Sequence, residues 1–166
     1  MMNTTELNSV EIARWDSSHA RWAELMQACS DLGHGADLEA KTADYHLGLY
    51  TLVAFTPHEV VGLLRFWTQQ IGLDEDKPLL LIEGEPTIEA KSVAFAVRPE
   101  FRRQGIGRRL QEAAIEWARE LGCYQLRSRS YYSCQENHAL KLSMGFAIQP
   151  AVQKEAHPSA YFVLPL

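Results

Sequence analysis

The feature that most constrains this fold is a predicted strand followed, after a short turn, by a long helix. Residues 90–97 are a mostly apolar run that stops before Pro99, which predicts a buried strand. Residues 105–121 repeat apolar side chains at helical spacing and are followed by Gly122, which predicts an amphipathic helix with a glycine at its end. A chain with this unit folds around at least one sheet that is covered by at least one helix.

The turn between this strand and this helix has the chemistry of an anion site. The first turn of a helix has N–H groups without intrahelical partners, and the helix dipole adds partial positive charge there. Gly105 and Gly107 lack a Cβ, so an anion can approach the backbone closely. Five arginines lie within twelve residues around the turn: Arg98, Arg102, Arg103, Arg108 and Arg109. The turn therefore predicts a phosphate site.

Two known phosphate loops do not match this turn. The sequence has no GxxxxGK[ST] pattern, which excludes a P-loop of the Walker A type. A dinucleotide-binding fingerprint needs a third glycine where Leu110 stands, near the beginning of a βαβ unit.

Composition limits the class of protein. The chain has 166 residues, 46% hydrophobic and 22% charged, which predicts one globular domain over residues 1–166. The net charge of −5 argues against nucleic acid and against anionic membranes as partners, so the arginine cluster suggests a small anionic ligand. Three cysteines without CxxC spacing predict neither a disulfide framework nor a metal site. With no signal-like or membrane-spanning apolar stretch, a cytoplasmic location is expected.

The remaining pattern predicts a mixed α/β order. Strands are expected at residues 10–15, 49–55, 60–67, 90–97, 124–130, 146–153 and 161–166, and residues 79–82 are expected to extend a neighbouring strand. Helices are expected at residues 18–29, 36–45, 105–121 and 136–144. Strands outnumber crossover helices, so a mixed sheet fits better than a doubly wound parallel one.

The turn and its surroundings resemble a known family. Arg102, Gly105 and Gly107 form R-x-x-G-x-G, preceded by Val97-Arg98-Pro99-Glu100, and a later helix ends in Gly145-Phe146. In these residues the chain resembles the GNAT superfamily of acyl-CoA-dependent N-acetyltransferases, most specifically over residues 90–146. The resemblance implies an α+β fold with a mixed, mostly antiparallel sheet of six to seven strands and about four helices. It also implies a splay between the fourth and fifth strands, residues 90–97 and 124–130.

The resemblance implies acetyl-CoA as cosubstrate, without a metal. Its pyrophosphate is expected on the backbone N–H groups of residues 103–108, and its pantetheine arm along residues 95–97, with the Val97 N–H facing the thioester oxygen. One of Arg108 and Arg109 is expected to face the cofactor, and the other to be a solvated helix charge. The expected cofactor-binding residues are Phe95, Ala96, Val97, Arg102, Arg103, Gln104, Gly105, Ile106, Gly107, Arg108 and Asn137.

The implied activity is direct transfer of an acetyl group to a primary amine of a small molecule or peptide. This needs a base for the amine and stabilisation of the leaving thiolate. Many relatives carry a tyrosine as proton donor four residues before the Gly of Gly-Phe, where this chain has Lys141, and an asparagine where it has Cys134. The candidates for the acid are Lys141, for which a solvated or phosphate-facing role is the plainer interpretation, and nearby hydroxyls: Tyr131, Tyr132 and Ser143.

The predicted base is Glu89, at the start of the central strand, with Glu83 and Glu85 as alternatives. Because the usual tyrosine is absent, a non-catalytic acyl-CoA sensor of the same fold is the alternative function. A homodimer is compatible with the sequence, and the acceptor amine is not identified by it.

Overall fold

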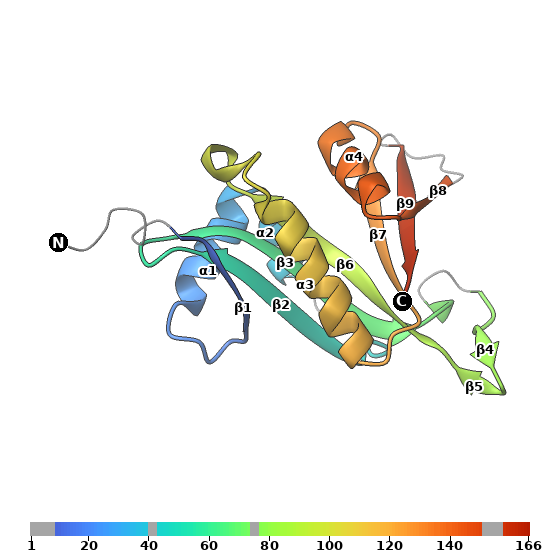
Figure 1. Ribbon diagram of the computed structural model, residues 1–166. Helices are drawn as coiled ribbons and strands as arrows, with labels where there is room; N and C mark the ends of the chain where they lie inside the picture. Colours follow the sequence, from blue (N-terminus) through green and yellow to red (C-terminus); the bar gives the residue numbers. More distant parts are fainter. Residues whose placement is uncertain (1–8, 40–42, 74–76, 151–157) are drawn as a thin grey trace.

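The computed structural model describes residues 9–39, 43–73, 77–150 and 158–166. These residues form a seven-stranded sheet with helices on both faces, and a small separate hairpin (Figure 1). The sheet strands are β1 (Glu11–Trp15), β2 (Gly48–Phe55), β3 (Val60–Gln70), β6 (Ile88–Val97), β7 (Gln125–Tyr131), β8 (Ala147–Pro150) and β9 (Ser159–Pro165). The helices are α1 (Trp22–Asp31), α2 (Gly35–Glu39), α3 (Ile106–Glu120) and α4 (Gln135–Ser143), with a 3₁₀ turn, η2 (Pro99–Phe101).

The sheet is mixed and mostly antiparallel, which confirms the predicted fold class. Its strand order is β1-β2-β3-β6-β7-β9-β8. Only β6 and β7 run parallel, and the other neighbouring pairs are antiparallel. This parallel pair is the one that α3 connects, because parallel neighbours need a crossover rather than a hairpin.

The parallel pair separates before its strands end. Paired residues run from Glu89 opposite Gln125 to Ser92 opposite Ser128. Beyond this point β6 continues to Val97 and β7 to Tyr131 without pairing to each other. The predicted splay between the fourth and fifth strands of the main sheet is therefore confirmed.

A β-bulge lies in β6 where the splay begins. Ser92 pairs with Phe66 and Ala94 pairs with Arg65, so Val93 is one extra residue in β6. The extra residue reverses the alternation of side chains along the rest of the strand. As a result the Phe95 ring faces α3, where a Cβ added to Gly107 would lie 3.3 Å from Phe95 Cζ.

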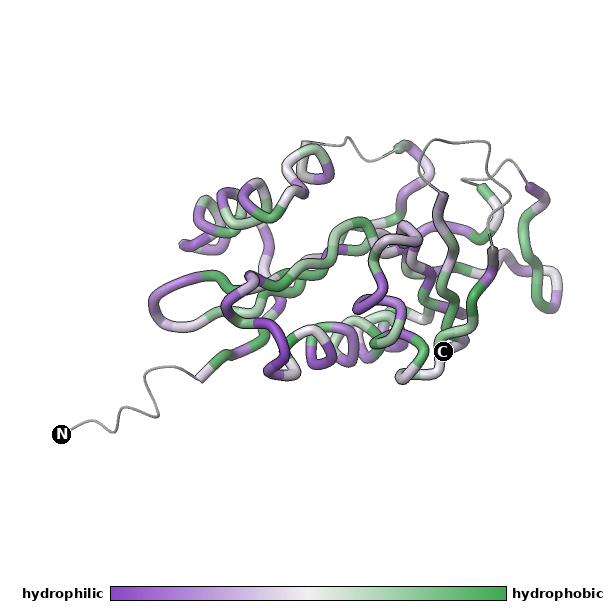
Figure 2. Tube along the Cα trace, turned by 90° about the horizontal axis from the view of Figure 1, so that it is seen from above, coloured by the Kyte–Doolittle hydropathy of each residue, from purple (hydrophilic) through white to green (hydrophobic). Residues whose placement is uncertain are grey.

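Two apolar cores hold the helices against the sheet. Viewed from above, α1 and α2 lie on the opposite side of the strands from α3, and apolar residues follow the strands between them (Figure 2). Leu110 and Ala114 of α3 are buried against one face of the sheet, together with Phe66. Leu25 and Ala28 of α1 are buried against the other face. This packing leaves the splayed ends of β6 and β7 as the break in the sheet.

Three expectations about element bounds were wrong. Residues 81–82 do not extend the main sheet, because β4 (Leu81–Ile82) pairs with β5 (Glu85–Pro86) in a separate hairpin. Glu83 and Gly84 both have positive φ, 53° and 87°, which is the geometry of a tight two-residue hairpin turn.

The other two differences concern helices. The first helix begins at Trp22 rather than residue 18, because the Asp16 carboxylate accepts hydrogen bonds from Ser18 and forms a local turn ahead of the helix. The second ends at Glu39 within the described residues, and residues 43–45 are not helical. Residues 40–42 of the predicted helix, and 151–153 of the predicted strand 146–153, lie outside the described residues.

Candidate active site

The start of α3 has the bare backbone that the sequence predicts. Gly105 has φ +79° and precedes the helix. The Arg109 N–H donates to the Gly105 carbonyl at 3.1 Å, which closes the first turn of α3. The N–H groups of residues 106–108 therefore have no acceptor within the helix and are available to an anion.

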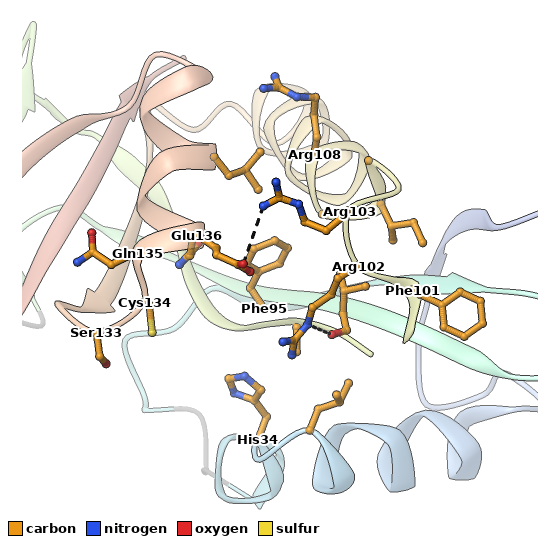
Figure 3. Close-up of a pocket in the computed structure, with 18 residues that line it drawn as sticks. His34, Phe95, Phe101, Arg102, Arg103, Arg108, Ser133, Cys134, Gln135 and Glu136 are labelled. Atoms are coloured by element: carbon orange, nitrogen blue, oxygen red, sulfur yellow. Dashed lines mark hydrogen bonds and ion pairs between the residues drawn. The ribbon is translucent and has the colours of Figure 1, made fainter. Parts of the chain in front are cut away.

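A cleft of about 660 Å³ lies between this helix start, the end of β6 and the start of α4 (Figure 3). Ten of the eleven predicted cofactor-binding residues line it: Phe95, Ala96, Val97, Arg102, Arg103, Gly105, Ile106, Gly107, Arg108 and Asn137. Gln104 does not line the cleft, and its side-chain amide donates to the Glu100 carbonyl at 3.3 Å. The cleft has the volume of a small-ligand site.

Three of the five clustered arginines line this cleft. Arg102 Nε donates to the Val97 carbonyl at 2.9 Å, and Arg103 Nη1 lies 3.9 Å from Glu136 Oε1 of α4. Arg108 Nη2 donates to Ser143 Oγ at 2.6 Å. These three guanidinium groups bring positive charge to the end of the cleft near the start of α3, and Arg103 and Arg108 contact α4 across it.

Arg98 and Arg109 point elsewhere. Arg98 Nε donates to the Val60 carbonyl at 2.8 Å, and Arg109 Nη1 donates to the Val10 carbonyl at 3.0 Å. Of the adjacent pair, Arg108 therefore faces the cleft and Arg109 does not.

The splayed end of β6 has main-chain donors that face the cleft. The Arg98 N–H donates to the Val61 carbonyl at 2.8 Å, toward β3. Because successive N–H groups of a strand point to opposite edges, those of Phe95 and Val97 point away from β3 and into the splay. An extended ligand in the splay can therefore hydrogen-bond to this edge as an added strand does.

Glu89 lies in a buried ion pair rather than in the cleft. Its carboxylate is fully buried and accepts hydrogen bonds from Arg127, with Nη2 at 2.5 Å from Oε1. Gln69 and Gln125 donate to the same carboxylate at 2.9 and 2.8 Å. The geometry thus gives Glu89 the role of partner to a buried cation, while its role as a base stays a prediction.

Lys141 is also buried, which contradicts the plainer expectation of a solvated or phosphate-facing lysine. Its side chain is 1% exposed, and Nζ donates to Ser128 Oγ at 2.5 Å, beside the Phe162 ring. Burial lowers the pKa of Lys141 to about 8. Ser128 is the last β7 residue that pairs with β6, so this ammonium group lies near the vertex of the splay.

Neither Lys141 nor Tyr132 lines the cleft. Tyr132 is exposed in the turn after β7. Asn137 does line it, and its Nδ2 donates to Ser130 Oγ at 3.2 Å. Cys134, at the start of α4, is exposed on the cleft.

Leu32 and His34 also line the cleft, from between α1 and α2. The sequence did not indicate this contribution.

The Acetyltransferase (GNAT) family model matches residues 13–146, most of the chain. The chain belongs to the GNAT acetyltransferase family. No curated protein sequence matches it significantly.

Solved GNAT structures have the same fold at low sequence identity. The chain is similar to Arabidopsis thaliana NAA60 in complex with acetyl-CoA, with TM-score 0.73 and 12% identity over 95% of this chain and 99% of that one. It is similar to a Klebsiella pneumoniae putative acyl-CoA N-acyltransferase, with TM-score 0.64 and 19% identity over 95% and 97%. It is also similar to the Escherichia coli ribosomal-protein-S18-alanine N-acetyltransferase, with TM-score 0.57 and 19% identity over 95% and 94%.

Among the described residues, no group of three or more His, Cys, Asp or Glu side chains is arranged to hold a metal ion. None of the helices described has the length and apolar character needed to cross a membrane.

Proposed function

We propose that this GNAT protein is an acetyl-CoA-dependent N-acetyltransferase that transfers the acetyl group directly to a primary amine of a small molecule or peptide. The observation that carries the proposal is the continuity of the cleft. Free amides and three arginines at the start of α3 lead directly to the unpaired edge of β6.

The residues of the cleft fit the parts of acetyl-CoA in order. The N–H groups of residues 106–108, with Arg103 and Arg108, suit a pyrophosphate, because bare amides and guanidinium groups both bind phosphate oxygens. The Phe95 and Val97 N–H groups suit the amide-containing arm and the thioester oxygen. Similar structures include a GNAT enzyme solved with acetyl-CoA, which supports this ligand.

The acceptor class is supported by another structure of Arabidopsis NAA60, solved with a bisubstrate analogue, with TM-score 0.69 and 13% identity. Lys141 is proposed to stabilise the leaving thiolate, since its buried ammonium lies near the vertex of the splay. Tyr132 is the proposed alternative proton donor, and a cytoplasmic location and a homodimer stay predictions from the sequence.

Adjacent arginines give a matched test of the phosphate site. Arg108→Ala removes a charged donor from the cleft, whereas Arg109→Ala removes an identical charge that faces the Val10 carbonyl. Acetyl-CoA affinity, measured by calorimetry, is expected to fall about tenfold or more in the first variant and to stay unchanged in the second, since a hydrogen bond to a charged group contributes roughly 1.5–3 kcal/mol. Equal effects of the two substitutions would refute this placement of the phosphates.

A second measurement separates the enzyme from the acyl-CoA sensor. Release of free thiol from acetyl-CoA in the presence of a primary amine is expected of the enzyme. Binding of acetyl-CoA without thiol release, across peptide and aliphatic amines, would instead support the sensor.

A further inference from the structure

His34 is the imidazole that lines the cleft, and it enters from the face of the sheet opposite α3. It lies between α1 and α2, where the His34 N–H donates to the Cys29 carbonyl at 2.9 Å. Cys29 is fully buried, so this bond fixes the backbone of His34 to the end of a packed helix. Figure 3 shows the ring projecting from this junction into the cleft, toward Arg102 and the end of β6.

Asp37 orients this ring. His34 Nδ1 lies 2.6 Å from Asp37 Oδ2, three residues later on the same helical turn. A carboxylate can only accept a hydrogen bond, so Nδ1 carries the proton of a neutral ring and the lone pair is on Nε2. Nε2 has no hydrogen-bond partner among the residues that the structure describes, and the side chain is 27% exposed. The ring is therefore oriented, unblocked and open to the cleft.

The position of the ring suits the acceptor rather than the cofactor. The start of α3, with Arg103 and Arg108, forms the proposed phosphate end of the cleft, while His34 lies near Arg102 and faces the splayed end of β6 from the α1–α2 side. An amine that reaches a thioester held against the Val97 edge can approach it along the His34 side of the cleft, because α3 and α4 pack on the other face.

We propose that His34 is the general base of the transfer reaction and that Asp37 positions it. This inference rests on the proposed function. An ammonium acceptor has three N–H protons and the amide product has one. His34 Nε2 takes one proton from the nitrogen and passes it to solvent. The nitrogen then forms its bond to the acetyl carbon while the carbon–sulfur bond breaks. The electron pair leaves on sulfur, which takes the second proton.

Glu89 and Lys141 are less well placed than His34 to act as the base. The Glu89 carboxylate is fully buried and already accepts hydrogen bonds from Arg127, Gln69 and Gln125. Lys141 is 1% exposed and its Nζ is bonded to Ser128. Neither lines the cleft, whereas His34 combines an oriented ring with direct access to it.

His34→Asn is the sharpest variant, because the asparagine amide can still donate to Asp37 but has no basic nitrogen. Thiol release is measured with acetyl-CoA and three primary amines: an alanyl peptide, a lysyl peptide and an aliphatic diamine. With the amine that wild-type protein acetylates fastest, kcat is expected to fall about 100-fold or more. This is the lower end of the rate enhancement that a general base contributes. The KM for acetyl-CoA is expected to stay within about twofold, and added imidazole is expected to restore part of kcat.

Two matched variants separate catalysis from structure. His58→Ala removes an exposed imidazole from the β2–β3 turn and is expected to leave kcat unchanged. Asp37→Asn keeps the base but weakens its orientation, so a fall of about tenfold is expected, at the lower end of what such an orienting partner contributes. Stabilisation of each variant by acetyl-CoA in thermal unfolding verifies that the cleft is intact.

The outcomes distinguish the two proposals. Wild-type protein that releases no thiol with any of the three amines overturns the proposed function, and this inference with it. Active wild-type protein with His34→Asn within threefold in kcat overturns the inference alone. A fall in kcat accompanied by loss of acetyl-CoA binding also overturns it, because His34 would then hold the cofactor. A large fall in kcat with intact binding and imidazole rescue supports it.

Discussion

Replacing Lys141 with methionine is expected to stabilise the protein near neutral pH. The ammonium of Lys141 is buried, has Ser128 Oγ as its hydrogen-bond partner and has a pKa lowered from 10.5 to about 8. At about 1.4 kcal/mol per pH unit, this lowering corresponds to a cost of about 3 kcal/mol for keeping the charge in the folded protein. Methionine is similar in volume and removes the charge. Loss of the hydrogen bond that Lys141 Nζ donates to Ser128 Oγ offsets about 1 kcal/mol, so we expect a gain of about 2 kcal/mol at pH 7.

The sign of this effect changes with pH. Below pH 8 Lys141 is protonated in both the folded and the unfolded chain. The folded state then carries the whole free-energy cost of burying the charge. Between pH 8 and 10.5 the unfolded chain holds a proton that the folded chain has lost, and wild-type stability from this group rises with pH. The advantage of the variant therefore shrinks over this window and is expected to reverse near its upper end.

Urea unfolding of both proteins at pH 7, 8, 9 and 10 measures the difference directly. Burial raises the pKa of the Cys29 and Cys123 thiols from 9.0 to about 11. Their contribution to the free energy of unfolding is therefore complete below pH 9 and is lost as the pH rises toward 11. That loss is common to both proteins and cancels in the difference. Lys77→Met, at an exposed lysine, is the control. A Lys141→Met protein less stable than wild type at pH 7, or a difference that does not change with pH, would refute the reasoning.

Two other results are expected. Glu89→Gln removes the carboxylate that pairs with the buried Arg127, so unfolding in urea should show a loss of about 3 kcal/mol. An unchanged pH–rate profile of the folded variant would also remove Glu89 as the base, and undiminished stability would contradict the ion-pair argument. Cys134 is exposed on the cleft, whereas Cys123 is buried. Iodoacetamide should therefore modify Cys134 first, as mass spectrometry can show, and saturating acetyl-CoA should slow that reaction; faster labelling of Cys123 would contradict the placement.

The cleft residues at the turn before α3 could be predicted because their signals are local. The glycines and arginines between residues 102 and 108 act through the backbone of one turn, and the helix after them has a strong apolar stripe. Which neighbouring arginine faces the cleft was left open, since Arg108 and Arg109 differ only in what each reaches across the fold.

The position of His34 in the cleft could not be predicted, because it depends on contacts between distant segments. A histidine and an aspartate three residues apart are common on helices, and only the packing of α1 against the sheet brings His34 to the cleft. Lys141 was misjudged for a related reason. A lysine on a short amphipathic helix is usually solvated, and its burial against β7 and β9 appears only once those strands are in place.

The single extra residue at Val93 divides β6 into two halves with different tasks. Up to Ser92 the strand is an ordinary interior member of the sheet, bonded on both edges. After Val93 the side chains change faces, and one edge of the backbone is exposed. If β6 continued in regular alternation, with Val93 itself paired to Arg65, the Phe95 ring would lie on the opposite face and the Phe95 and Val97 N–H groups would point at β3. The bulge therefore directs these two N–H groups, the proposed donors to the acetyl-CoA arm and its thioester oxygen, into the splay rather than toward β3.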